Sequence, residues 1–292
     1  MPLFEYDFLQ RALVAAAIVG LVAPLIGVFL VQRRLALLGD GMGHVALAGV
    51  GIAFLFGTAP VPTALVAAAA GAVVIELIRA KSRTAGDLAL ALIFYGGIAG
   101  GVLFTYLAGG KSSAALNQYL FGSLSTVSAS DLAWLAVVAL LVIVVLATFG
   151  REIFVMALDP DLARTQGIRV TAMSMLLTVL AALTVVIGMR TVGLLLVSAI
   201  MIVPVAAAQQ LTRAFRTTAM IGVVVGELSA VLGLFSSYSL DVPPGPAIVM
   251  VALLLFGVCA ALAVPVRRRR SRRVAAAAAA ATAGAEPIGA HA

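Results

Sequence analysis

Residues 132–149 read LAWLAVVALLVIVVLATF, and no charged residue occurs between Asp131 and Arg151. A helix needs about 20 consecutive, mostly apolar residues to cross the hydrocarbon core of a bilayer. A membrane-spanning β-strand needs only about 10 residues and alternates in polarity, which this stretch does not. We therefore predict a transmembrane α-helix over residues 131–149, and this helix indicates the fold class of the chain.

Similar long apolar runs recur along the whole sequence. Soluble domains contain roughly 45–50% apolar and about 25% charged residues, whereas this chain has 63% hydrophobic and 11% charged residues. The second run is short, so a bundle of eight helices is the alternative to one of nine. We predict an all-α polytopic membrane protein of about nine transmembrane helices, at residues 8–31, 41–57, 61–79, 88–108, 131–149, 171–189, 192–210, 217–238 and 246–265.

The 19 lysines and arginines are distributed unevenly around these segments. With the N-terminus outside, 16 of them fall on the cytoplasmic side and 3 on the external side. This asymmetry favours an external N-terminus and a cytoplasmic C-terminus. We predict a membrane domain over residues 1–266 with a cytoplasmic loop at 150–170. Residues 267–292 form a basic and then alanine-rich tail with few side chains to bury, which predicts disorder.

The predicted cytoplasmic loop contains the signals of a short helix. Asp159 can cap a helix whose first residue is Pro160, Asp161 falls in its first turn, and Gly167 supplies the stop. A helix of about two turns would leave Leu162 on an exposed face. A structural connector and a docking site for a cytoplasmic partner both explain this pattern.

Asp40 and His44, at the start of the second segment, form the candidate metal site. At positions i and i+4 of a helix the two side chains share one face, where carboxylate and imidazole could bind one divalent cation. The alternative is a helix cap, Asp40, with a hydrogen-bonded neighbour. His291 lies in the tail, so His44 is the only histidine of the membrane region. A permanent tetrahedral zinc cage is therefore disfavoured, and a transient site is expected.

Two further carboxylates lie within predicted spans, where an unpaired charge is costly. Glu76 precedes Arg79 by three residues, and we expect the two to form an ion pair. Glu227 has no cation nearby on its own helix, so it must face the interior of the bundle. Glu227 and Ser198 are candidate residues of a transport pathway, and a structural role is the alternative for Glu227.

Nothing in the sequence predicts covalent chemistry. Gly109-Gly110-Lys111-Ser112 resembles part of a phosphate-binding loop, but Thr105 stands where that motif requires glycine. A His-Glu-x2-His helix, which an intramembrane metalloenzyme would need, does not occur in the sequence. The single cysteine, Cys259, excludes an intrachain disulfide and a cysteine-based metal cluster. We expect no enzyme activity in this chain and no permanently bound cofactor.

Five sequence motifs in order resemble the membrane permease of bacterial zinc/manganese/iron ABC importers, the ABC-3 family. The resemblance covers about residues 8–265. The motifs are Arg33-Arg34 followed by Gly39-Asp40-x3-His44, then Tyr119-Leu120-Phe121-Gly122, then Asp159-Pro160-Asp161-Leu162-Ala163-x3-Gly167, then Val192-Gly193-Leu194-Leu195-Leu196 leading to Ile202-Val203-Pro204, and last Asp241-x-Pro243-x-Gly245-Pro246.

The resemblance implies a homodimer of permeases in the bacterial cytoplasmic membrane. Cytoplasmic ATP-binding subunits would dock on the coupling helix, through Asp159, Asp161, Leu162, Ala163 and Gly167, and an extracytoplasmic protein would deliver the metal. The family's metal path is carried onto Asp40 and His44. Zinc is our first expectation for the cargo, with manganese or iron as the alternative.

Two other transport functions are weighed against this reading. A siderophore or vitamin ABC permease would share the docking helix, but it would need a wide cavity and no Asp40–His44 pair. A stand-alone carrier driven by protons would use Glu227 and would need no ATPase. Dependence of transport on a nucleotide-binding subunit separates this last alternative from the importer.

Overall fold

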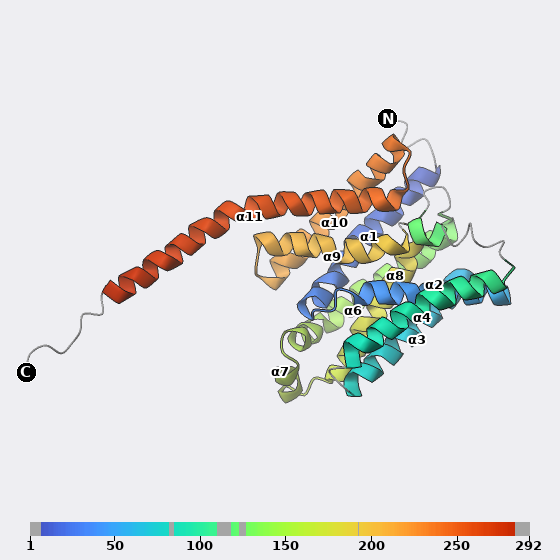
Figure 1. The fold of residues 1–292 in the computed structure, drawn as a ribbon, viewed down its shortest axis with the longest axis horizontal. Helices are drawn as coiled ribbons and strands as arrows, with labels where there is room; N and C mark the ends of the chain where they lie inside the picture. The colour runs from blue at the N-terminus through green and yellow to red at the C-terminus, as the bar shows by residue number, and fades with distance from the viewer. Residues whose placement is uncertain (1–6, 82–84, 110–117, 123–126, 192, 284–292) are drawn as a thin grey trace, which may run out of the picture.

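The computed structural model describes residues 7–81, 85–109, 118–122, 127–191 and 193–283 (Figure 1). Within these residues the chain is nearly all helical and has no β-strand, which confirms the predicted fold class. The helices are α1 (Asp7–Gln32), α2 (Leu38–Phe56), α3 (Pro60–Lys81), α4 (Ala85–Leu107), α6 (Ala129–Leu158), α7 (Pro160–Thr165), α8 (Val170–Thr191), α9 (Leu194–Leu211), α10 (Phe215–Leu240) and α11 (Pro244–Ala283).

Eight of the described helices are long and apolar enough to cross a membrane. The helix that falls short is α9, whose apolar part covers Leu196–Leu211, and not the second segment as predicted. α2 has 19 residues and meets the length requirement. α9 starts late because Gly193 before it has a φ of 89°, a left-handed conformation that interrupts a right-handed helix.

The connection between α6 and α8 is more helical than predicted. α6 continues to Leu158, beyond the predicted end at residue 149, because Ile153 and Met156 bury an apolar face on its last turns. α7 follows after one residue, Asp159. The non-helical part of the predicted 150–170 loop therefore reduces to Asp159 and residues 166–169.

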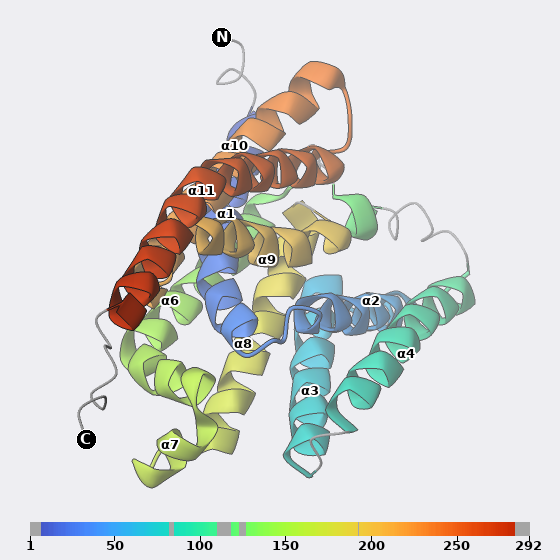
Figure 2. The same ribbon diagram turned by 60° about the vertical axis from the view of Figure 1, so that its left-hand side comes forward.

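The helices form two groups joined by α8 and α9 (Figure 2). α2 packs on α3 and α4, while α1 packs on α9 and α10, and α11 covers α9 and α10. α8 contacts α3 of the first group and α1 and α6 of the second. α7 lies at one end of this bundle, beside the C-terminal residues of α1 and α3 and the start of α8. We call this the α7 end.

Glycines allow the closest approaches between helices. Gly97 of α4 rests on the backbone of α2, where an added Cβ would lie 2.6 Å from the carbonyl carbon of His44. Gly27 of α1 rests on α9 in the same way, since an added Cβ would lie 1.8 Å from the carbonyl oxygen of Met201. Small residues at such contacts are typical of membrane bundles, where backbones must approach to gain packing energy.

α11 continues as helix from the apolar part, Pro244–Val264, into the basic segment as far as Ala283. Alanine and arginine are strong helix formers, which agrees with this continuation. The segment after residue 266 extends away from the bundle in Figure 1, and an isolated helix is marginally stable in water. Residues 284–292 lie outside the described part of the chain. Disorder of the tail in solution therefore stays a prediction.

Gly27→Ala should destabilise the bundle, because its new methyl group must displace the α9 backbone. Overpacking of this kind costs about 1–3 kcal/mol, which a lower melting temperature of the purified protein in detergent would report. Gly257→Ala is the matched control, since a Cβ at Gly257 meets nothing within 4 Å. Equal melting temperatures for the two variants would contradict the α1–α9 contact.

Candidate functional site

Asp40 lies in the first turn of α2, and His44 lies one turn further on. The N-cap of α2 is Leu37, and no side chain caps the helix by a hydrogen bond. The structure also gives no hydrogen bond between Asp40 and His44 within the described residues. In this structure Asp40 therefore does not cap α2 and is not hydrogen-bonded to His44, so the helix-cap alternative is wrong.

His44 is held between α2 and α4 by contacts that involve no hydrogen bond at Nδ1. Its side chain is buried, with 6% of the residue exposed, and its ring meets Phe94 edge-on at a centroid distance of 4.4 Å. Gly97 of α4 packs against the backbone at the same position. The Nδ1 atom is buried and has no hydrogen-bond partner. Such an atom is costly unless a ligand or water satisfies it.

Ser198 of α9 lies beside the start of α2. A Cβ added at Gly39 would lie 3.5 Å from Ser198 Oγ, so the absence of a side chain at Gly39 leaves room around this hydroxyl. Ser198 Oγ is also buried without a hydrogen-bond partner. These two atoms, Ser198 Oγ and His44 Nδ1, lie on helices that contact each other, α9 and α2. The structure thus leaves two buried polar atoms without a hydrogen-bond partner on these two helices.

The described residues of one chain supply only part of a metal site at Asp40 and His44. No group of three His, Cys, Asp or Glu side chains that could hold a metal ion occurs in the described residues. Glu227 lies on α10, which packs mainly against α1, α9 and α11, and its backbone is close to Gly20 of α1. The structure therefore does not bring Glu227 together with Asp40 and His44, and a role for Glu227 in a pathway stays a prediction.

The predicted short helix at residues 160–165 is confirmed as α7. Asp159 Oδ1 accepts hydrogen bonds from the backbone amides of Asp161, at 2.9 Å, and Leu162, at 3.1 Å. Gly167 ends the segment with a φ of 78°. Ala163 is fully buried, whereas Leu162 is 46% exposed. α7 is thus anchored on one side and presents an apolar side chain on the other.

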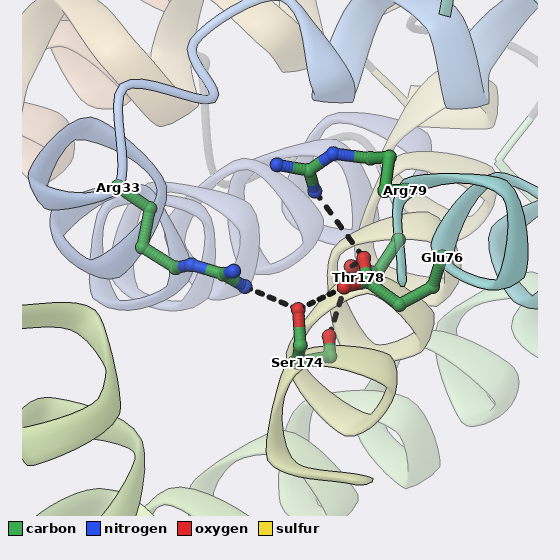
Figure 3. A network of polar contacts seen from close by, with 5 residues as sticks. All are labelled: Arg33, Glu76, Arg79, Ser174 and Thr178. Atoms are coloured by element: carbon green, nitrogen blue, oxygen red, sulfur yellow. Dashed lines mark hydrogen bonds and ion pairs between the residues drawn. The ribbon is translucent and has the colours of Figure 1, made fainter. Parts of the chain in front are cut away.

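A polar network at the α7 end joins α3, α8 and the connection between α1 and α2 (Figure 3). Glu76 is buried and forms the predicted ion pair with Arg79, at 3.2 Å between Oε2 and NH1. The Glu76 carboxylate also accepts hydrogen bonds from the hydroxyls of Ser174 and Thr178, and Arg33 donates to the Ser174 hydroxyl. Ser174 therefore links the arginine after α1 to the carboxylate on α3.

Sequence analysis identified the Glu76–Arg79 pair but missed Arg33, Ser174 and Thr178 as its partners. Ser174 and Thr178 lie 98 and 102 residues from Glu76, so no local spacing points to them. One signal was available, since serine and threonine four residues apart share a helix face. That face supplies the two hydroxyl donors that a buried carboxylate requires.

Comparisons with known proteins agree with this arrangement. The profile of the ABC 3 transport family matches residues 5–263. The chain is 35% identical over 254 residues to the manganese transport system membrane protein MntC of Listeria innocua, covering 87% of this chain and 90% of that protein. It is 32% identical over 255 residues to the manganese import system permease protein ScaB of Streptococcus gordonii, covering 87% and 91%.

Two solved structures have a similar fold. The structure of PsaBC from Streptococcus pneumoniae in complex with Fab superposes with a TM-score of 0.80 and 31% identity, covering 88% of this chain and 92% of that one. An inward-facing conformation of a putative metal-chelate type ABC transporter superposes with a TM-score of 0.73 and 18% identity, covering 88% and 87%. The second likeness extends to the fold alone.

Glu76→Gln should lower the stability of the bundle, because it replaces a buried, charge-paired acceptor by a neutral amide. Breaking a buried ion pair costs about 3–5 kcal/mol when one partner is removed, and the amide retains part of the hydrogen bonding. We therefore expect a loss of about 2–4 kcal/mol, measured as a decrease in melting temperature in detergent.

Asp161→Asn is the matched control for this change. Asp161 also pairs with an arginine three residues away, Arg164, but both side chains are exposed, at 76% and 59%. Exposed pairs contribute about 0–1 kcal/mol, so Asp161→Asn should leave the melting temperature almost unchanged. A larger effect at Asp161 than at Glu76 would contradict the structural role of the network.

Proposed function

Because the chain belongs to the ABC 3 transport family, and is thus the multi-pass permease subunit of an ABC metal importer and not an enzyme, we propose that its cargo is manganese. The observation that carries this proposal is the name shared by relatives of 32–35% identity over 87% of the chain, which are called manganese transporters. Zinc, the first expectation from the sequence, becomes the alternative together with iron.

The donor atoms of the candidate site are compatible with manganese but do not select it over zinc. Carboxylate and water oxygens suit manganese, whereas imidazole suits zinc, copper, iron and nickel. The membrane region offers one histidine, His44, beside one carboxylate, Asp40. A site with one imidazole and one carboxylate per chain accepts manganese, but zinc binds the same donors more tightly, so the choice of cargo rests on the names of the relatives.

We propose Asp40 and His44 as ligands that bind the metal transiently during passage. The unpartnered Nδ1 of His44 supports this role, because a metal would satisfy it. The described part of one chain supplies no third His, Cys, Asp or Glu ligand at this position. A second permease copy in a homodimer would supply the remaining ligands. Ser198, whose hydroxyl is also unpartnered, would lie along the same path.

We propose that α7 couples the permease to its ATPase subunit. Its exposed Leu162 offers an apolar contact, while the Asp159 cap, the buried Ala163 and the turn at Gly167 hold the helix in place. α8 begins immediately after this segment, and Ser174 in its second turn is bonded to both Arg33 and Glu76. A displacement of α7 by the ATPase would thus reach the connection that precedes Asp40 and shift the bundle between two states.

The proposed membrane orientation has an external N-terminus and a cytoplasmic C-terminus. Arg33, Arg79 and Arg164 gather at the α7 end, which agrees with one cation-rich cytoplasmic face. An extracytoplasmic binding protein would then deliver the metal at the opposite end.

Metal uptake by cells that lack their own manganese and zinc importers tests the function. The cells would express this permease with its ATPase and binding protein, and manganese, zinc and iron would be measured in parallel. We expect wild type to restore manganese accumulation, and Asp40→Asn and His44→Ala to lower it at least tenfold, since each removes a metal ligand worth more than about 1.4 kcal/mol. Restoration of zinc but not manganese would overturn the choice of cargo.

Glu227→Gln is the control variant for these ligand changes. It also alters a carboxyl group inside the membrane region, but the structure does not group Glu227 with Asp40 and His44. We expect manganese uptake within about twofold of wild type at equal membrane abundance, and loss of uptake when the ATPase subunit is inactivated. Normal transport by the Asp40 and His44 variants, or persistent uptake without ATP hydrolysis, would contradict the proposed mechanism.

Thiol labelling tests the orientation, because Cys259 is the only cysteine and can be replaced by serine. Single cysteines would then be placed at Ser130, at the start of α6, and at Thr165, at the end of α7. In intact cells a membrane-impermeant maleimide should label position 130 and not position 165, and permeabilised cells should show labelling at both. The reverse pattern would show that the chain is inserted the other way.

A further inference from the structure

A basic pocket lies at the α7 end and is not part of the Asp40–His44 site. Its volume is about 380 Å³, and residues of α3, α7, α8 and the α1–α2 connection line it. Its charged lining comprises Arg33, Arg79, Lys81, Arg164 and Glu76. Thr171 and Ser174 add hydroxyl groups. The pocket therefore presents four cations and one carboxylate.

The carboxylates available in the structure do not neutralise these cations. Glu76 pairs with Arg79 and is further saturated by two hydroxyl donors. Arg164 pairs with Asp161, at 2.5 Å between NH1 and Oδ1. Within the described residues no carboxylate lies within 4 Å of Arg33 or of Lys81. Among the described side chains, four cations thus face two carboxylates, Glu76 and Asp161, which leaves a net charge of +2.

Of Arg33 and Lys81, Arg33 is the costlier charge. Its side chain is half-buried, and its one described side-chain hydrogen bond goes to the neutral hydroxyl of Ser174, although a guanidinium group has five N–H donors. Burial lowers the pKa of Arg33, the charge of Glu76 raises it, and the charge of Arg79 lowers it. The two guanidinium groups are therefore close enough to repel each other. Glu76 offsets part of the cost of burying this cation, and an anion bound in the pocket would offset more of it.

We propose that this pocket binds a phosphate group, either of an anionic lipid headgroup or of soluble phosphate. Arginine binds phosphate through paired N–H donors, and the net positive charge of the pocket attracts both the singly charged phosphodiester of an anionic lipid and the more highly charged inorganic phosphate ion. The pocket lies where the spans α1 and α3 end, at Gln32 and Lys81, which is the depth expected for lipid headgroups. Its volume accommodates a phosphate group with bound water.

A bound phosphate would connect the two moving parts of the proposed mechanism. It would bridge Arg33, on the connection that leads to Asp40, and Arg164, on α7. The binding itself depends neither on the transported metal nor on the ATPase. If the pocket does not bind phosphate, the proposed transport function is unaffected. If the cargo is not manganese, the proposed phosphate site is unaffected.

Isothermal titration calorimetry on the purified full-length permease in neutral detergent tests this proposal. One arm titrates inorganic phosphate, and a second titrates dihexanoyl phosphatidylglycerol, with dihexanoyl phosphatidylcholine as the lipid that carries no net charge. We expect binding of at least one of the two anions and none of the phosphatidylcholine. Binding of phosphatidylglycerol alone identifies the lipid as the source, and binding of phosphate alone identifies the soluble ion.

Variants show whether this pocket is the site. Arg33→Gln should weaken binding about tenfold or more, because it removes a charge-assisted hydrogen bond. Lys81→Gln should weaken binding about threefold. Because Lys81 is exposed, this substitution should not disturb folding, and a loss of affinity would report on the pocket. Arg151→Gln is the matched control, because exposed Arg151 of α6 does not line the pocket. Its affinity should equal that of wild type.

Three results would overturn the proposal. The first is that wild type binds neither anion. The second is equal affinity in wild type and in both pocket variants, or an equal loss in Arg151→Gln. The third comes from repeating the titration on the permease–ATPase complex. Binding that is present in the permease alone but lost in the complex would show that an acidic side chain of the ATPase fills the pocket instead of phosphate.

Discussion

Lipid supplies no hydrogen-bond partner, and this constraint determines how every polar atom in the bundle is placed. Backbone groups are satisfied inside the helices, which is why the described chain has helices and no strands. Polar side chains within the spans either form hydrogen bonds with neighbouring helices or remain unpaired, which costs free energy. The structure shows both outcomes.

Glu76 represents the first outcome. Three donors from α3 and α8 surround its carboxylate, and a fourth residue, Arg33, reaches it through the Ser174 hydroxyl. His44 and Ser198 represent the second, because each retains a buried polar atom without a partner. A buried polar atom without a partner is costly, and a metal bound at the proposed site would satisfy the one on His44. The described helices thus contain one polar cluster with several internal hydrogen bonds and two polar atoms with none.

The sequence predicted the features that depend on local spacing. The apolar runs predicted the spans, and Asp159 with Pro160 predicted the start of α7. The three-residue interval between Glu76 and Arg79 predicted their ion pair. The resemblance to the ABC-3 family, carried by short motifs in order, was also correct. Features that depend on distant residues could not be predicted in this way. Arg33 and Ser174 are 141 residues apart, and nothing in either neighbourhood indicates that they meet.

The length of α9 was a second feature that apolar patterning could not give. Residues 192–210 form an apolar run, but the left-handed conformation of Gly193 delays the helix. A Cβ on this glycine would lie 2.5 Å from the backbone of Phe121, so a tertiary contact determines where α9 begins. The candidate metal site, Asp40 and His44, stays a prediction from the sequence. The contacts of His44 with Phe94 and Gly97 of α4 could not be predicted without the three-dimensional arrangement.

The contact of Gly97 with the backbone at His44 also limits how metal preference can evolve in this chain. The α4 helix rests directly on α2 at this point, and Phe94 holds the imidazole ring from one side. A residue larger than glycine at position 97 would separate the two helices at the proposed ligand His44. At the proposed site, a change of donor residue would therefore alter the metal preference with less disturbance of the packing than a change at position 97.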